Sequence, residues 1–234
     1  MFILNLIKNV FLLIALTAIY QVIGARVGKG SFQNKVISGV LFGAVGIMGM
    51  MTPLIYSPGI LLDGRSIILS IAGYFGGPIV AAVAATITVS YRLYIGGAGV
   101  FVGVATILEA ALMGVIFHFL WYRNKKETGF FRLWLFGFLT TSIVLLTFLA
   151  LPGKSGLEVV RQLALTILIS YPVATVLLCL LFMDYERQSD ATEALSQSES
   201  LHRGIFQNAA AGVDVVDRDG RFIQVNSTLC DILG

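Results

Sequence analysis

The sequence predicts an all-α polytopic membrane protein, in which a bundle of six transmembrane helices precedes a helical linker and an incomplete α/β domain. Hydrophobic residues make up 57% of the 234 residues and charged residues only 12%, whereas a soluble domain carries about 25% charge. After Met183 the composition changes abruptly to a polar one. The net charge of +3 includes no basic stripe interleaved with aromatic residues, so we expect no nucleic-acid partner.

Six apolar runs are each long enough to cross a bilayer, since a helical span takes about 20 residues. The first run is too long for a signal-peptide core and lacks a convincing cleavage site, so we expect it to remain as a helix. Aromatic residues near the run ends, Tyr171 among them, are expected in the interfacial belts. The six expected spans are Ile3–Ile23, Val36–Tyr56, Ser66–Ser90, Gly99–Trp121, Phe131–Leu151 and Val160–Met183.

Glycine pairs occur inside two of these spans. Gly39 with Gly43, and Gly99 with Gly103, have the small-xxx-small spacing that lets helix backbones approach closely. We expect most of these glycines to serve helix packing.

The third span lies in the most informative stretch, from Asp63 to Gly97. One straight helix from Arg65 to Arg92 would extend roughly 40 Å, beyond a hydrocarbon core of about 30 Å. The helix is therefore either tilted past the core or broken at Gly76-Gly77-Pro78, because proline removes a backbone donor and glycine permits a break. Non-helical backbone at membrane depth survives only where protein or a water-filled cavity covers it, so a break would mark a site.

Charged side chains along this stretch are candidate ligand groups. Arg65 is either a fixed positive charge at a ligand cavity, paired with Asp63 or a neighbouring helix, or a side chain that reaches the headgroups. The same two interpretations apply to Arg92. A spacing of two places Asp63 and Arg65 on different helix faces, which does not guarantee a local ion pair. Gly96 and Gly97 indicate a tight turn that lets backbone approach a ligand.

Glu109 lies near the middle of the fourth span, where an ionised carboxylate is expensive. We expect it to face the bundle interior and to be protonated or paired, with Arg65 and Arg92 as candidate partners. A structural hydrogen bond from a neutral carboxyl is the alternative. His118, near the end of the same span, is expected at the interface rather than at a ligand. A half-helix beginning at Pro78 would offer free N–H groups to an anion or a carbonyl oxygen.

The polar tail begins with a helix over residues 184–203, which contain no glycine or proline. Its weak apolar stripe leaves open a dimeric coiled coil or a plain amphipathic linker. Two strands, Val213–Val216 and Phe222–Val225, are predicted around an Asp219-Gly220 turn. A short helix capped by Asn226 or Ser227 follows to Leu233. These elements cannot bury a core, so we interpret residues 204–234 as the opening of a domain.

No catalytic constellation is present in the sequence. There is no phosphate-binding Gly-Lys-Ser/Thr loop and no spacing of zinc ligands, and Cys179 and Cys230 suggest no disulfide. His202 precedes the predicted strands and has no kinase core beside it, which argues against a phosphoacceptor role. We therefore expect no catalytic residue, no metal and no cofactor in this chain.

The tail resembles the start of a PAS domain. The resemblance implies the first two strands and the first helix of that fold, and it identifies no PAS cofactor. The residues that carry it are Ile205-Phe206-Gln207-Asn208-Ala209, Gly212-Val213, Val216-Asp217, Asp219-Gly220-Arg221, Val225-Asn226 and Leu229 to Gly234.

The membrane part, from about Val36 to Met183, resembles the 5TM receptor domain of the LytS-YhcK type. Asp63-Gly64-Arg65 stands where that family has Asn-x-Arg, with aspartate in place of asparagine. The triplet Gly76-Gly77-Pro78 resembles the family's Gly-Gly-Pro. Arg92, followed by Gly96 and Gly97, resembles its arginine followed by Gly-Gly.

The two resemblances together imply the input module of a bacterial signal-transduction protein. Residues 1–183 would form the sensor, 184–203 a signalling linker and 204–234 the start of a PAS domain, with a histidine kinase or diguanylate cyclase as output. A small ligand, cell-wall-derived or anionic, would bind within the helix bundle. The expected ligand-binding residues are Asp63, Arg65, Gly76, Gly77, Pro78, Arg92, Gly96, Gly97 and Glu109.

The resemblances also imply a place in the cell. A homodimer through the linker and PAS segment is expected, in the bacterial inner membrane with both termini in the cytoplasm. On that topology Arg65 belongs to the inner loops and Arg92 to the outer ones. A small-solute transporter, or its membrane substrate-binding subunit, is the alternative, because glycine-rich helices, a broken segment and an intramembrane glutamate also fit that class. The PAS-like tail favours the sensor.

Overall fold

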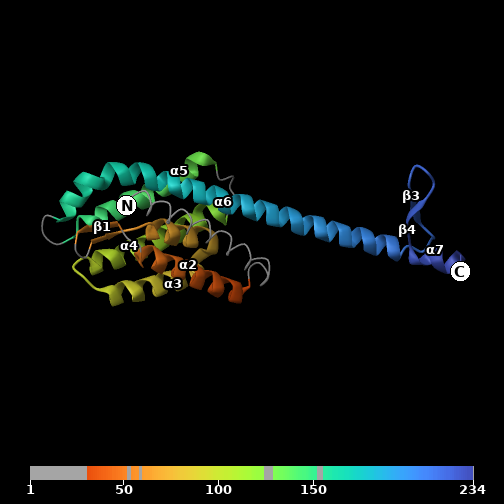
Figure 1. The fold of residues 1–234 in the computed structure, drawn as a ribbon, viewed down its shortest axis with the longest axis horizontal. Coiled ribbons are helices and arrows are strands. Elements are labelled where there is room, and N and C mark those ends of the chain that lie inside the picture. Colours follow the sequence, from red (N-terminus) through yellow and green to blue (C-terminus); the bar gives the residue numbers. More distant parts are fainter. Residues whose placement is uncertain (1–30, 52–53, 58–59, 124–128, 152–154, 234) are drawn as a thin grey trace. The chain divides into compact units, whose positions relative to one another are not determined.

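A computed structural model describes residues 31–51, 54–57, 60–123, 129–151 and 155–233 (Figure 1). The chain divides into two compact units, Met1–Phe182 and Met183–Gly234. The first contains a helix bundle, and the second contains the end of a long helix with a small hairpin.

Five helices in the described residues are long and apolar enough to cross a membrane, so this is a multi-pass membrane protein. Helices occur at five of the six expected spans, although the third is broken at Gly77, and the first span, Ile3–Ile23, lies outside the described residues. The helices are α2 (Phe32–Met51), α3 (Arg65–Ile95), α4 (Val100–Phe117) with a π-helical turn η1 (His118–Tyr122), α5 (Phe130–Phe148) and α6 (Ser155–Gln207).

A β-hairpin replaces the predicted end of the second span. α2 stops at Met51, and β1 (Leu54–Ser57) pairs antiparallel with β2 (Ile60–Leu62). The prediction of a helix through Tyr56 is therefore wrong. Pro53 accounts for the difference, because a proline disfavours helical conformation at the residue before it. The hairpin delivers the chain directly to Asp63 at the start of α3.

The helix α3 is broken at the predicted place. Gly77 has φ 72° and ψ −167°, which is not helical, and Pro78 follows it. A positive φ favours glycine because glycine has no Cβ. We call residues 65–76 α3a and residues 78–95 α3b. Of the two alternatives that the sequence left open, the broken helix is the one observed.

Contacts with α4 give the direction of α3b. Gly103, near the start of α4, packs on Arg92 near the end of α3b. His118, directly after α4, faces Gly77 at the beginning of α3b. The two helices therefore run antiparallel, side by side.

The segment α3a runs in the opposite direction to α3b. Ser66, at its start, lines the same cavity as Thr106 near the start of α4. Gly73, further along, packs on Gly114 near the end of α4. α3a is thus parallel to α4, and the chain turns back at Gly77.

Glycines of α2 pack closely against α3b, as the small-xxx-small spacing predicts. The contacts run in the same direction along both helices, so α2 and α3b are parallel. The facing pairs are Gly39 with Val83, Gly43 with Ile87 and Gly46 with Thr88. Gly99 and Gly103 behave differently: Gly99 caps α4, and Gly103 faces the Arg92 side chain rather than a helix backbone.

The remaining helices close the bundle on its other side. Gly137 of α5 packs on Pro172 and Thr175 of α6. At the end of the bundle where α3 begins, α4, α5 and α6 share an apolar cluster of Val102, Val144, Leu145, Phe148, Leu151 and Ile167. Near Gly77 a set of aromatic rings joins α3a, α4, α5 and α6, namely Tyr74, Phe75, Phe117, Phe136 and Phe182.

The second unit contains the predicted hairpin and helix. β3 (Asp214–Val216) pairs antiparallel with β4 (Phe222–Val225), and α7 (Ser227–Leu233) follows. Gly220 takes φ 78° in the turn between the strands. Asn226 is fully buried and joins the parts: its Oδ1 accepts from the backbone N–H groups of Val213 and Leu229.

Candidate functional site

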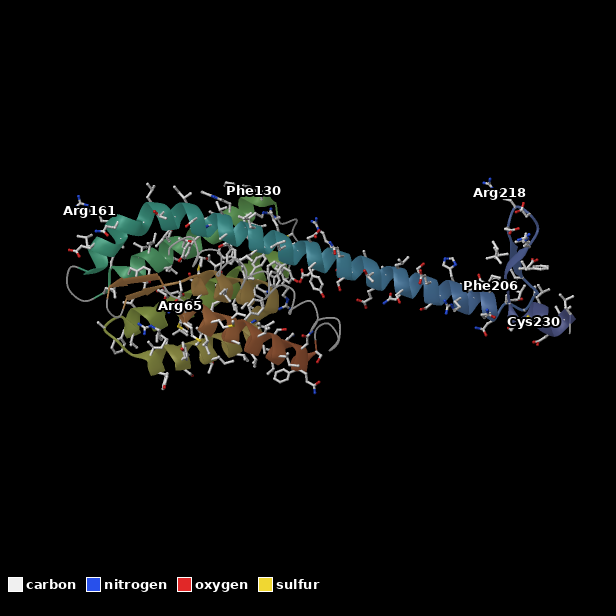
Figure 2. All side chains as sticks on the ribbon, viewed as in Figure 1. Arg65, Phe130, Arg161, Phe206, Arg218 and Cys230 are labelled. Atoms are coloured by element: carbon white, nitrogen blue, oxygen red, sulfur yellow. The ribbon has the colours of Figure 1, made fainter. Side chains whose placement is uncertain are left out.

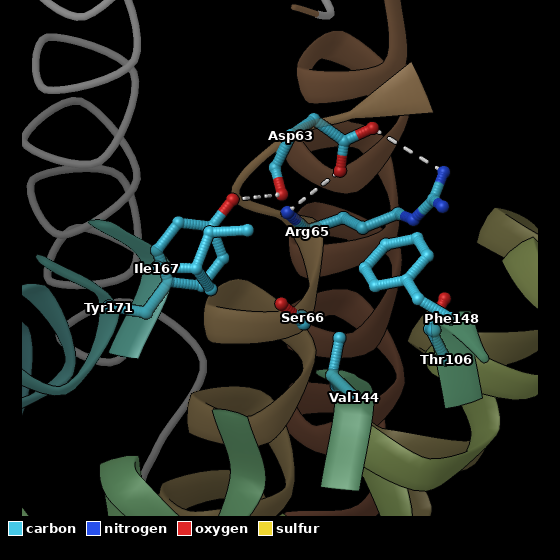
Figure 3. A pocket seen from close by; sticks show the side chains of 8 residues that line it. All are labelled: Asp63, Arg65, Ser66, Thr106, Val144, Phe148, Ile167 and Tyr171. Atoms are coloured by element: carbon cyan, nitrogen blue, oxygen red, sulfur yellow. Dashed lines mark hydrogen bonds and ion pairs between the residues drawn. The ribbon is translucent and has the colours of Figure 1, made fainter. Parts of the chain in front are cut away.

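A small cavity lies where α3a begins, among four helices (Figure 3). Its volume is about 20 Å³, which is room for about one water molecule. The lining combines a charged pair, two hydroxyl side chains and a tyrosine with apolar side chains. The residues are Asp63, Arg65, Ser66, Thr106, Val144, Phe148, Ile167 and Tyr171.

Asp63 and Arg65 form a buried ion pair in this cavity. The Nη1 of Arg65 lies 3.4 Å from Oδ2 of Asp63. The backbone N–H of Arg65 also donates to Oδ1 of Asp63, at 3.1 Å. The pair forms despite the spacing of two, because α3 begins at Arg65 and Asp63 still lies outside the helix. Arg65 is only 5% exposed, which is not the environment of a side chain that reaches the headgroups; Figure 2 shows it within the bundle.

Arg92 joins the same end of the bundle. It is 1% exposed, and its Nη1 donates to the Gly96 carbonyl at 2.7 Å. Arg92 acts electrostatically on both Asp63 and Arg65. The predicted placement of the two arginines on opposite sides of the membrane is therefore wrong, because the reversal at Gly77 returns α3b to the end where α3a began.

The site contains two positively charged side chains and one carboxyl group. Burial raises the pKa of Asp63, while the positive charges of Arg65 and Arg92 act in the opposite direction. Two arginines lie near one aspartate, so the cluster carries an excess positive charge when all three are ionised. Three of its buried atoms make no hydrogen bond: Nε of Arg92, and the two atoms of the ion pair, Oδ2 of Asp63 and Nη1 of Arg65, which face each other at 3.4 Å. Buried polar atoms normally have partners, and these three could accept from or donate to a bound molecule.

The other predicted site residues lie elsewhere. Gly96 and Gly97 form the turn after α3b with φ 70° and 97°, close to the arginines. Gly76, Gly77 and Pro78 form the reversal at the far end of α3a. The nine residues thus do not form one site.

Glu109 is not paired with either arginine in the described contacts. It is half-buried on α4 and does not line the cavity. The hydroxyl of Thr147 on α5 lies 2.6 and 2.7 Å from its two carboxylate oxygens. A neighbouring-helix hydroxyl, rather than an arginine, is therefore the partner that the structure gives it.

His118 has a role that the sequence interpretation missed. The segment α3a ends at Gly76, so the carbonyl of Tyr74 in its last turn has no amide four residues ahead in the same helix. Nδ1 of His118 lies 2.7 Å from that carbonyl oxygen. A carbonyl only accepts, so Nδ1 carries the proton. No feature of the sequence pairs His118 with this carbonyl, because the two residues are 44 positions apart.

Tyr171 was also missed, because an aromatic residue near a run end fits the interfacial belt. It is instead a cavity residue, and its hydroxyl donates to the backbone carbonyl of Asp63 at 3.1 Å. No feature of the α6 sequence distinguishes it from a belt tyrosine.

The comparison with known families decides what kind of bundle this is. A family model described as 5TMR of 5TMR-LYT matches residues 17–185. The chain belongs to this family. The 5TMR-LYT domain is a membrane sensor module typical of signalling proteins, and the resemblance to the 5TM receptor is confirmed. Searches of curated proteins and of solved structures found no match.

The 5TMR-LYT match contains the whole cavity. Every lining residue, from Asp63 to Tyr171, falls inside the matched range, as do Arg92, Gly77 and His118. Among the described residues no group of three or more metal-ligating side chains occurs. The chemistry of the site is therefore that of arginines, a carboxylate and hydroxyls.

Proposed function

We propose that this chain is the input module of a bacterial signal-transduction protein, and that the cavity beside Arg65 and Arg92 binds a small anionic ligand. The observation that carries the proposal is the buried cluster of two arginines and one aspartate. Nε of Arg92 has no hydrogen-bond partner there, and the two atoms of the Asp63–Arg65 ion pair make no hydrogen bond. Its place inside a sensor family supports it. Cell-wall fragments that carry carboxylates belong to this ligand class.

Ligand binding must change the bundle. A cavity of about 20 Å³ admits a water but not a carboxylate with its substituents. An anion would compete with Asp63 for Arg65, and the helices around the cavity would separate to admit it. Only the opened state would then bind the ligand well, and this differential affinity is what lets a ligand shift an equilibrium.

The proposed orientation follows from α6. Its Tyr171 lies at the cavity, and Phe182 lies near the reversal at Gly77, since it stacks on Phe75 at 5.2 Å. With the C-terminus in the cytoplasm of a bacterial cell, the cavity would lie in the outer half of the inner membrane. Extracellular ligands would then reach it without crossing the bilayer.

The tail would carry the signal onward. The hairpin and α7 support the start of a PAS domain, which would precede a histidine kinase or diguanylate cyclase. Exposed Leu195, Leu201 and Ile205 on α6 support a homodimer through the linker. Crosslinking of a single cysteine at 195 in membranes tests the dimer, and an exclusively monomeric product would reject it.

Anion binding tests the receptor proposal directly. Purified protein in nanodiscs would be titrated with small carboxylates, inorganic phosphate and peptidoglycan fragments. Arg65→Ala and Arg92→Ala should each weaken binding by about 10- to 100-fold, the usual loss for a hydrogen bond to a charged group. Arg161→Ala is the matched control, because Arg161 is exposed at the start of α6 (Figure 2). Unchanged affinity in the cavity variants, or no binding of any anion, would reject the proposal.

A transporter remains the second candidate, and the half-buried Glu109 favours it. Intramembrane carboxylates mark ion and substrate pathways in transporters. Proteoliposome uptake of the same anions separates the two functions, because a sensor binds its ligand without moving it across the membrane.

A further inference from the structure

We infer that Tyr171 is a positioning residue that couples the cavity to α6. The inference rests on the proposed receptor function and adds the route by which that cavity acts on the rest of the chain. Its starting point is one partly buried hydrogen bond, which the Tyr171 hydroxyl donates to the Asp63 carbonyl. Asp63 is also the residue whose carboxylate holds Arg65. A movement of Asp63 therefore acts on α6 through this hydroxyl.

The next residue of α6 makes the helix responsive at this point. Pro172 has no N–H, so the carbonyl of Leu168 loses the helical hydrogen bond that it would otherwise accept. Ile167 and Tyr171, one turn apart, both line the cavity immediately before this weakened turn. Helix bends occur at such prolines. A force applied at Tyr171 thus reaches α6 where its hydrogen-bond ladder is interrupted.

A second contact lies on the other side of Pro172. Phe182 of α6 stacks on Phe75 of α3a, with ring centroids 5.2 Å apart. α6 is therefore contacted twice by this part of the chain. Asp63, which lies two residues before α3a, contacts it before the proline, and Phe75 of α3a contacts it after the proline. Tyr171 and Phe182 are eleven residues apart, which corresponds to about 16 Å along the helix. A shift of α3a relative to α6 would change at least one of these contacts.

Hydrogen exchange of α6 amides tests the coupling without a ligand. The perturbation is Arg65→Gln, which removes the partner of the Asp63 carboxylate. In the full chain in nanodiscs it should change the exchange rates of amides 173–182 by about fivefold, and by less than about twofold when Tyr171→Phe is also present. Tyr94→Phe, an exposed tyrosine on α3b, is the matched control and should leave the fivefold effect intact.

Two results would overturn the inference. Equal effects of Arg65→Gln with and without the hydroxyl would make Tyr171 a structural residue only, and no effect in either background would mean that the cavity does not reach α6. If Tyr171→Phe fails to fold, 3-fluorotyrosine at position 171 keeps the ring and strengthens the donor, and the coupling should then grow; an unchanged coupling would also overturn it. Anion titration measures ligand binding separately from amide exchange. Failure of the receptor proposal can therefore be distinguished from failure of the coupling through Tyr171.

Discussion

At the scale of single residues, the buried guanidinium of Arg92 explains why position 103 has no side chain. A Cβ at Gly103 would overlap Nε of Arg92 and lie 3.1 Å from its Cδ. That guanidinium is fixed at its other end by the Gly96 carbonyl, so it has little room to move. Gly103 therefore determines where Arg92, the arginine that neighbours the cavity without lining it, can lie.

We expect Gly103→Ala to destabilise the bundle by about 1–3 kcal/mol, the usual cost of forcing an extra methyl group into a packed interior. Gly49→Ala on α2 is the matched control, because nothing lies within 4 Å of a Cβ built there. Thermal unfolding in one detergent would compare the two variants. Equal unfolding midpoints would show that Arg92 adjusts freely, contrary to the role given to Gly103.

His118 gives a second prediction at this scale. His118→Ala removes the 2.7 Å hydrogen bond to the Tyr74 carbonyl and should cost about 0.5–1.5 kcal/mol, the usual net contribution of one hydrogen bond. His202→Ala, at an exposed position on α6, should change stability little. Chemical denaturation followed by circular dichroism would measure both. A loss no larger than that of the control would mean that another donor reaches the carbonyl.

At the scale of elements, α3 is the unusual one, because a single helical run folds back on itself. The reversal needs a positive φ at Gly77 and a residue after it that starts a helix without an N–H partner, which proline does well. His118 then supplies the missing donor at the turn. These local features together convert an apolar stretch that is too long for one crossing into two shorter antiparallel segments.

Gly77→Ala tests this element. An L-residue with φ near 72° costs roughly 1–2 kcal/mol, and the new methyl group would also meet the His118 ring at about 3.2 Å. Gly64→Ala is the control, since Gly64 has φ −80° and open space around its Cβ position. The unfolding midpoint should fall for the first variant alone. Similar midpoints would contradict the observed turn.

The sequence allowed the break in α3 to be located, because glycine and proline act on their own backbone. It did not allow the direction of the break to be predicted, since a kink and a reversal leave the same local pattern. The roles of Tyr171 and His118 were missed because each makes a hydrogen bond to a residue more than forty positions away, which no local pattern reveals. Arg65 and Arg92 were found because they stand at the two ends of the broken stretch and at the positions of the family's arginines.

At the scale of the whole bundle, the reversal decides the topology. With α3 straight, its two ends would label from opposite faces of the membrane; with α3a and α3b antiparallel, they share one face. Single cysteines at Gly64→Cys, Tyr94→Cys and Arg123→Cys, in a chain without Cys179 and Cys230, would report this through a membrane-impermeant maleimide. We expect positions 64 and 94 to label in right-side-out vesicles and position 123 in inverted ones, because residue 123 follows η1 at the end near Gly77. Labelling of 64 and 94 from opposite sides would reject the reversal and, with it, a cavity shared by both arginines.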